Sequence, residues 1–317
     1  MGGTIGIVAP ASKPSPTAIA MGVERLKKMG FNVVLGDCVK KTLRRGYLAA
    51  SDEERARELN DMFANEKIDG ILCARGGYGC LRILPLLDYD SIRDHPKILM
   101  GMSDIVSALL AIYKKTGLVT FHGPWVLAPV MTKYTQDELL RALTSTDPMG
   151  KVPSPAEGPF IQTIREGKAE GQLMGGNLDL VAASLGTEYE IDLKGKLFFF
   201  EAASHRVWEI DRHLTHLSLA GKLGTAAGFI AGPMKAVEPH ERAAQELSLG
   251  LTEPPDFSFS SSVEEMLHER LSQFAVPSIY GICCGHTENQ TVLPIGVRAS
   301  LNSTEGALTI TETALVR

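Results

Sequence analysis

The stretch "ILMGMSDIVSALL" (98–110) predicts a strand that turns directly into a helix. Its apolar run is interrupted at Gly101-Met102-Ser103-Asp104 and then resumes with the spacing of an amphipathic helix. Ser103 falls at this junction, where a serine is either a helix cap or a nucleophile held at a strand-to-helix turn. The second glycine of the GxSxG elbow is absent, so the stretch alone favours the cap.

Strand and helix patterns alternate on both sides of this stretch, which indicates parallel βαβ units over the first 125 residues. Ser15 is expected to cap one helix, and Ser51 with Glu54 is expected to form a capping box at the next. The fold class is therefore α/β, with an N-terminal Rossmann- or flavodoxin-like domain built on a parallel sheet. The strands expected in it are residues 4–10, 31–36, 69–74, 97–101 and 118–123.

The length of 317 residues allows two domains. Residues 144–176 gather prolines, glycines and charges without periodicity, which indicates a linker or crossover. We therefore predict a first domain over 1–145, a linker over 146–170 and a smaller mixed α/β domain over 171–317. Beyond the linker, the strand candidates are 196–202, 224–232, 278–286 and 292–301, and the helix candidate is 209–221.

Composition and charge exclude several classes of protein. The net charge of -5 and the absence of a basic block argue against a nucleic-acid partner. No apolar stretch reaches the roughly 18 residues that a membrane span needs, and the start lacks the pattern of a signal peptide. We expect a cytoplasmic protein without a membrane partner. The five cysteines are scattered and form no CxxC pair, so we expect buried free thiols and neither a metal site nor a cofactor.

Two loops are expected at the carboxyl ends of the parallel strands, where open α/β sheets bind their ligands. The first is "ARGGYG" (74–79), whose paired glycines can turn backbone N–H groups toward an anion, although such pairs are more often simple tight turns. The second is the Ser103 turn. There the N–H of Asp104, at a helix N-terminus, can face the oxyanion of an acyl transfer.

A serine nucleophile also needs a base and an acid that orients it. His286 follows an apolar run and a glycine, although a polar loop histidine has the same pattern. Glu201 stands at the exit of "KLFFFEA" (196–202), where an unpaired carboxylate is unfavourable. His213 and His216 have metal-like spacing, but neither HExxH nor a third nearby ligand accompanies them, so a solvated helix face is the better interpretation.

Seven segments, taken in their order, resemble the LD-carboxypeptidase family of serine peptidases, which also includes the microcin-immunity hydrolases. They run from about residue 5 to about residue 302. They are "GIVAPAS", "ARGGYG", "GMSD", "FHGP", "GGNL", "FFFEA...EIDRHLTHL" and "CCGH...LPIG". The resemblance implies a catalytic triad of Ser103, Glu201 and His286, with Met102 standing where an aromatic residue is common in the family.

The resemblance also implies an oxyanion hole made by the backbone N–H groups of Gly77 and Asp104. It further implies an active site between the two domains and a homodimer. The residues expected to contact the substrate are Gly76, Tyr78 and Asn177.

The segment after Glu201 departs from the family pattern, because Ala202 and His205 lie where family members often carry acids. These positions are expected to shape the substrate pocket. Between Glu201 and His286, the polar stretch "GLTEPPDFSFSSS" (250–262) is expected to form an elaborated loop.

The resemblance makes a murein tetrapeptide the leading substrate. Cleavage would release the terminal D-Ala from the L-centre of a diamino acid during cytosolic wall recycling. One alternative is an acylated nucleotide, as in the microcin-immunity relatives, whose base would stack on Trp125 or Trp208. A second alternative is a catalytically silent two-domain module that binds a small ligand.

Overall fold

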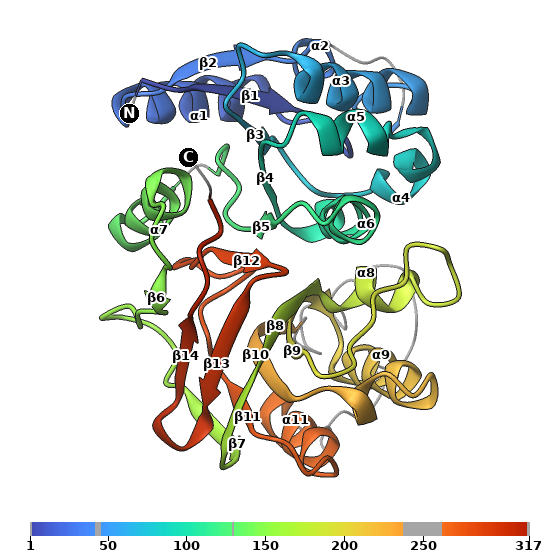
Figure 1. The fold of residues 1–317 in the computed structure, drawn as a ribbon, viewed down its shortest axis with the longest axis vertical. Helices are drawn as coiled ribbons and strands as arrows, with labels where there is room; N and C mark the ends of the chain where they lie inside the picture. Colours follow the sequence, from blue (N-terminus) through green and yellow to red (C-terminus); the bar gives the residue numbers. More distant parts are fainter. Residues whose placement is uncertain (1, 42–45, 129, 237–261, 316–317) are drawn as a thin grey trace, which may run out of the picture.

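The computed structural model describes residues 2–41, 46–128, 130–236 and 262–315 (Figure 1). The loop predicted at 250–262 lies outside these ranges except for its last residue. Within them, no helix combines the length and the apolar character that crossing a membrane requires.

The first sheet has the strand order β12-β5-β4-β3-β1-β2, and its five N-terminal strands are parallel. This confirms the predicted parallel-sheet domain. Its strands are β1 (Thr4–Val8), β2 (Asn32–Leu35), β3 (Gly70–Cys73), β4 (Ile98–Gly101), β5 (Thr120–His122) and β12 (Leu293–Ile295).

Strand β12 comes from the far end of the chain and pairs antiparallel with β5. The sequence predicted one strand over 292–301, but the chain breaks at Gly296, whose φ of 99° lies in the left-handed region. The residues after this break form β13 (Arg298–Asn302) in the second sheet. One predicted strand is therefore two, and each belongs to a different sheet.

Two helices of the N-terminal half begin where the sequence predicted. The Ser15 hydroxyl accepts from the N–H of Ala18, and Ser51 forms the predicted capping box with Glu54. The helices are α1 (Pro16–Lys28), α2 (Asp37–Lys40), α3 (Asp52–Ala64), α4 (Cys80–Ile83), α5 (Tyr89–Asp94), α6 (Val106–Thr116) and α7 (Lys133–Thr144), with 3-10 turns η1 (Leu84–Leu86) and η2 (Ser103–Ile105).

Helix α6 lies between the two sheets (Figure 1). Its residues 106–112 are all buried, as expected of a helix that is apolar on every side. It contacts β4 and β5 of the first sheet as well as β8 (Lys168–Asn177) and α8 (Leu178–Ala183) of the second lobe. The helix that follows Ser103 is thus packed against both halves of the molecule.

The second sheet has the order β6-β14-β13-β8-β9-β10-β11-β7 and mixes parallel and antiparallel pairs. With its helices it confirms the mixed α/β class of the second lobe. The remaining elements are β6 (Gly150–Lys151), β7 (Gln162–Arg165), β9 (Leu197–His205), α9 (Val207–Leu219), η3 (Leu223–Thr225), β10 (Gly228–Ala236), α11 (Val263–Leu271), β11 (Ser278–Tyr280), η4 (Ser303–Glu305) and β14 (Ala307–Ile310).

The segment 144–176 is more regular than predicted, because it contributes β6, β7 and β8 to the second sheet. Strands β6 and β7 are the two edges of this sheet, and their side chains are largely exposed. Such strands show no alternation of apolar and polar residues, which is why the sequence suggested a linker over 146–170. The domain limits 1–145 and 171–317 stay predictions.

Strand β9 runs through the middle of the second sheet, between β8 and β10. Phe198, Phe199 and Phe200 are fully buried there, and the strand carries Glu201 to the same depth. The cysteines are buried free thiols, as predicted: Cys38, Cys73, Cys80, Cys283 and Cys284.

Candidate active site

Ser103 has a backbone conformation that few residues adopt. Its φ is 61°, and it is the one non-glycine residue with a positive φ among those the structure describes. The preceding Met102 occupies the N-cap position of η2, and no side chain caps this helix. The helix-cap interpretation of Ser103 is therefore wrong. Left-handed conformations of this kind cluster at functional sites, where the surrounding structure holds them in place.

The double-glycine loop approaches the Ser103 turn closely. A Cβ atom added to Gly76 would lie 2.6 Å from the Cβ of Ser103 and 3.2 Å from the backbone N of Asp104. Gly77 has a φ of 102°, which side chains disfavour. The loops after β3 and β4 therefore meet at the carboxyl edge of the first sheet, as the sequence predicted.

Two polar side chains hold these loops together. The Ser12 hydroxyl accepts from the N–H of Tyr78, and the Ser12 N–H donates to the Gly76 carbonyl, both at 3.2 Å. The buried Asp104 carboxylate accepts from the N–H of Cys80 at 2.7 Å, and burial raises the pKa of Asp104. These contacts hold the double-glycine loop against the Ser103 turn and the segment after β1, while the Tyr78 ring stays exposed.

Replacing Gly76 by alanine is expected to lower kcat/KM by about 10- to 100-fold, since the new methyl group displaces the Ser103 side chain. Thermal unfolding should change little by comparison with the rate. Gly224→Ala is the matched control, because a Cβ there meets no atom within 4 Å. Full activity of Gly76→Ala with an unaltered fold would contradict the placement of this loop beside the reacting serine.

Glu201 and His286 form a direct pair. The His286 Nδ1 atom lies 2.8 Å from a Glu201 carboxylate oxygen. Gly285 has a φ of 80°, and a Cβ there would collide with the Glu201 carboxyl group. The Asn177 amide donates to the other Glu201 oxygen at 3.1 Å, and its own oxygen accepts from the N–H of Leu180. The buried Asn177 thus supports Glu201, and its predicted substrate contact stays a prediction.

A second histidine, His122, also faces Glu201. Its Nε2 atom lies 3.7 Å from a Glu201 carboxylate oxygen, and both side chains are buried. Burial acts to raise the pKa of Glu201, but the imidazoles of His122 and His286 outweigh it and lower this pKa to about 2. Glu201 is therefore a carboxylate at neutral pH, able to orient His286 and to stabilise its protonated form.

The sequence analysis gave His122 no role of its own, because it considered this residue only as part of the motif "FHGP". The available signal was its place at the carboxyl end of β5. There His122 pairs with Gly101, two residues before Ser103. His122 thus ties the Glu201–His286 pair to the strand end where the Ser103 turn begins.

Two further contacts join the lobes around this point. Gly176, at the end of β8, lies against Val106 at the start of α6. The Trp125 ring, in the loop after β5, meets the His286 ring edge-on at 5.3 Å between centroids. The residues predicted from distant parts of the sequence are thus gathered where the two lobes meet.

The comparisons with known proteins show the family of the chain. The LD-carboxypeptidase N-terminal domain family matches residues 5–123, and the LD-carboxypeptidase C-terminal domain family matches residues 170–301. A probable murein peptide carboxypeptidase of Bacillus subtilis is 36% identical over 313 residues, which cover 96% of this chain and 90% of that protein. The chain belongs to the LD-carboxypeptidase family.

Solved structures of relatives have the same two-lobe fold. The microcin C7 self-immunity protein MccF, in complex with aspartyl sulfamoyl adenosine, superposes with a TM-score of 0.85 at 27% identity over 100% of this chain and 98% of that one. The muramoyltetrapeptide carboxypeptidase from Oxalobacter formigenes gives 0.79 at 25% identity, over 96% and 97%. The family and these relatives show that the protein is a serine-type carboxypeptidase, a hydrolase.

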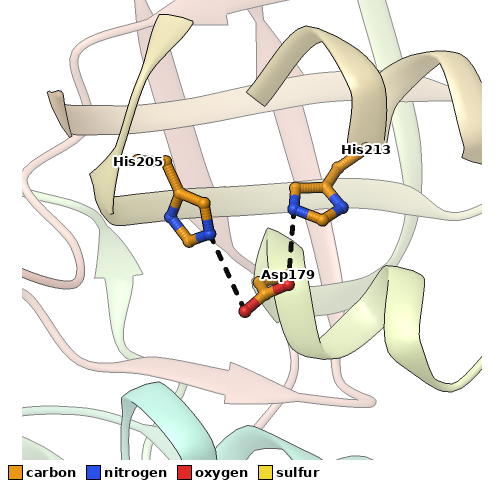
Figure 2. Close-up of side chains that lie close together, drawn as sticks. All are labelled: Asp179, His205 and His213. Carbon is orange, nitrogen blue, oxygen red and sulfur yellow. Dashed lines mark ion pairs between the residues drawn. The ribbon is translucent and has the colours of Figure 1, made fainter. Parts of the chain in front are cut away.

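Beyond Glu201, the structure corrects one interpretation of a histidine. His213 is not on a solvated helix face, because it packs with His205 and Asp179 (Figure 2). Burial lowers its pKa. His216, three residues later, is exposed as predicted.

Trp208, the other tryptophan of the chain, is partly exposed. Its ring packs against the guanidinium groups of Arg206 and Arg212, at 5.4 and 5.1 Å from the centroid. The tryptophan ring that contacts His286 is therefore that of Trp125.

Proposed function

We propose that this enzyme removes the terminal D-Ala of a murein tetrapeptide by cleaving its bond to the L-centre of the diamino acid, with Ser103, His286 and Glu201 as the triad. The observation that carries the proposal is the 2.8 Å contact between Glu201 and His286. This contact lies where the two lobes meet, and His122 connects it to the strand end at which the strained Ser103 turn begins. The Bacillus subtilis relative supports a murein peptide as the substrate.

The first half of the reaction transfers the acyl group to Ser103. His286 is held by Glu201 through Nδ1, which leaves Nε2 to take the Ser103 proton while the oxygen attacks the carbonyl carbon. The carbonyl oxygen becomes an oxyanion and accepts from the N–H groups of Gly77 and Asp104. When the tetrahedral intermediate collapses, D-Ala departs with the proton carried by His286.

The second half releases the shortened peptide. Water gives a proton to His286 and attacks the ester carbonyl, and a second tetrahedral intermediate forms in the same oxyanion hole. Its collapse breaks the bond to Ser103, whose oxygen recovers the proton from His286. The ionised Glu201 stabilises the imidazolium in both halves.

Of the two alternative functions, the relatives favour a second substrate over a role without catalysis. The likeness to MccF bound to aspartyl sulfamoyl adenosine favours an acylated nucleotide as the second candidate substrate, with Trp125 beside His286 as an aromatic surface. A silent ligand-binding module fits less well, since the family is one of hydrolases.

Substrate choice tests the proposal directly. Purified enzyme should release free D-Ala from L-Ala-γ-D-Glu-meso-diaminopimelate-D-Ala, and at least about 100-fold less alanine from the same peptide ending in L-Ala. Aspartyl sulfamoyl adenosine should stay intact under the same conditions. Hydrolysis of the nucleotide without release of D-Ala would replace the proposal by its alternative, and turnover of neither compound would contradict both.

The expected cellular setting stays a prediction. Cytoplasmic location and a homodimer were expected from the sequence and the family resemblance. A cytoplasmic location accords with an enzyme that recycles small wall peptides.

A further inference from the structure

Three metal-binding side chains converge beside the candidate active site, from three different elements. Asp179 comes from the first turn of α8, His205 from the end of β9 and His213 from α9 (Figure 2). The His213 Nε2 atom lies 3.3 Å from one Asp179 oxygen, and the His205 Nε2 atom lies 3.8 Å from the other. All three ligand atoms lie within 4.8 Å of one another.

The hydrogen bond on the far side of the His205 ring determines its tautomer. The Nδ1 atom lies 2.8 Å from the Ala203 carbonyl oxygen, which can only accept, so Nδ1 carries a proton. In the neutral ring, Nε2 then presents a lone pair toward the Asp179 carboxylate, which also offers only lone pairs. A cation between them removes this repulsion. An Nδ1–H bond to a backbone carbonyl is also the usual support of a metal-bound histidine.

We propose that Asp179, His205 and His213 bind one zinc ion, with a fourth position left for water. Two imidazoles and one carboxylate suit Zn²⁺ among the common divalent ions. Tetrahedral zinc with bonds of about 2.0–2.1 Å places its ligand atoms about 3.3 Å apart. The His213–Asp179 separation of 3.3 Å already matches this spacing, and the His205–Asp179 separation of 3.8 Å is slightly longer.

The surroundings allow an ion to enter. The Asp179 side chain is 44% exposed, whereas the two histidines are mostly buried at 20% and 16%. The ligands are therefore reachable from solvent on the carboxylate side and confined on the imidazole side. The charge of Arg212 opposes a bound cation, while Glu209 and Asp179 favour one.

A bound zinc ion would help to hold the residues around Glu201 in place. Asp179 follows Asn177 by two residues, and His205 follows Glu201 by four. Asn177 donates to Glu201, so a zinc ion would clamp α8 to the end of β9 beside this hydrogen bond. The inference stands apart from the proposed function, because metal binding is measured without turnover.

Metal stoichiometry is the test. Full-length protein without a histidine tag is stripped with a chelator, mixed with Zn²⁺, desalted and analysed for bound metal. We expect about one zinc per chain, and an absorption spectrum typical of tetrahedral Co²⁺ when cobalt replaces zinc. His213→Ala and Asp179→Asn should lose this equivalent and the rise in melting temperature that zinc gives the parent protein.

His216→Ala is the matched control, since His216 is exposed on the same helix and should leave the stoichiometry unchanged. Asp179→Asn keeps the shape of a part-exposed side chain, so it reports on binding even if His213→Ala folds poorly. Less than about 0.1 zinc per parent chain would overturn the proposal. Equal stoichiometry in the parent protein and Asp179→Asn would also overturn it.

Discussion

Ser103→Ala is expected to lower kcat/KM for release of D-Ala by about 10⁴-fold or more, because it removes the atom that attacks the carbonyl. The fold should be retained. The left-handed conformation belongs to the turn rather than to the hydroxyl group, and no side-chain cap is lost. Progress curves for D-Ala release, with circular dichroism of the same samples, measure both parts of this prediction.

Ser107→Ala is the matched control for this change. Ser107 lies in α6, one turn beyond Ser103, and its buried hydroxyl has no hydrogen-bond partner in the described structure. Its loss should therefore leave the rate within about 2-fold of the parent enzyme. A folded Ser103→Ala variant with more than a tenth of the parent activity would remove Ser103 from the proposed mechanism.

Glu201→Gln is the second change with a large expected effect, a loss of about 10³- to 10⁴-fold in kcat. The amide keeps the shape of the carboxylate but removes its charge. His286 then loses both its orientation through Nδ1 and the stabilisation of its protonated form. Steady-state kinetics should show this loss in kcat with little change in KM, because the charge matters most in the transition state.

The stability of the same variant should depend on pH in a defined direction. The pKa of Glu201 is lowered from an ordinary value of 4.5 to about 2. Its charge therefore stabilises the folded state fully above about pH 4.5, and this contribution is lost as the pH falls toward 2. The free energy of unfolding of the parent relative to Glu201→Gln should fall over that range in urea titrations.

Glu58→Gln provides a control of opposite sign. Glu58 is a buried carboxylate in the first lobe, and burial raises its pKa although it accepts from the N–H groups of Ala9 and Cys38. The parent should gain stability relative to this variant as the pH falls, and the variant should retain activity. The same trend in both variants would contradict the lowered pKa of Glu201.

The sequence patterns predict the five parallel strands of the first lobe and its longer helices α1, α3 and α6, because these elements show apolar runs or helical periodicity. The capping residues Ser15 and Ser51 mark helix starts that the structure confirms. Strands β6 and β7 were missed because edge strands with exposed side chains lack such a pattern. Strand β12 pairs with β5 in the first sheet because the backbone turns at Gly296. The periodicity of the sequence does not reveal such a turn.

In the candidate site, the sequence identifies the residues but not the contacts between them. The sequence predicts both Glu201 and His286 at strand ends, but β9 continues to His205 and β11 already ends at Tyr280. The two residues are 85 positions apart, and their contact depends on the left-handed turn at Gly285. Whether Ser103 is a cap or a strained turn depends on its φ, which residue types leave open. The error at His213 has the same origin, since helical spacing defines a face but not the element that packs on it.

The most direct test of the triad is to react the enzyme with a fluorophosphonate and map the adduct by peptide mass spectrometry. We expect one adduct, on Ser103, that abolishes D-Ala release and forms at least about 100-fold more slowly in His286→Ala. An adduct confined to another residue would contradict this expectation. Undiminished release of D-Ala by fully labelled enzyme would do the same.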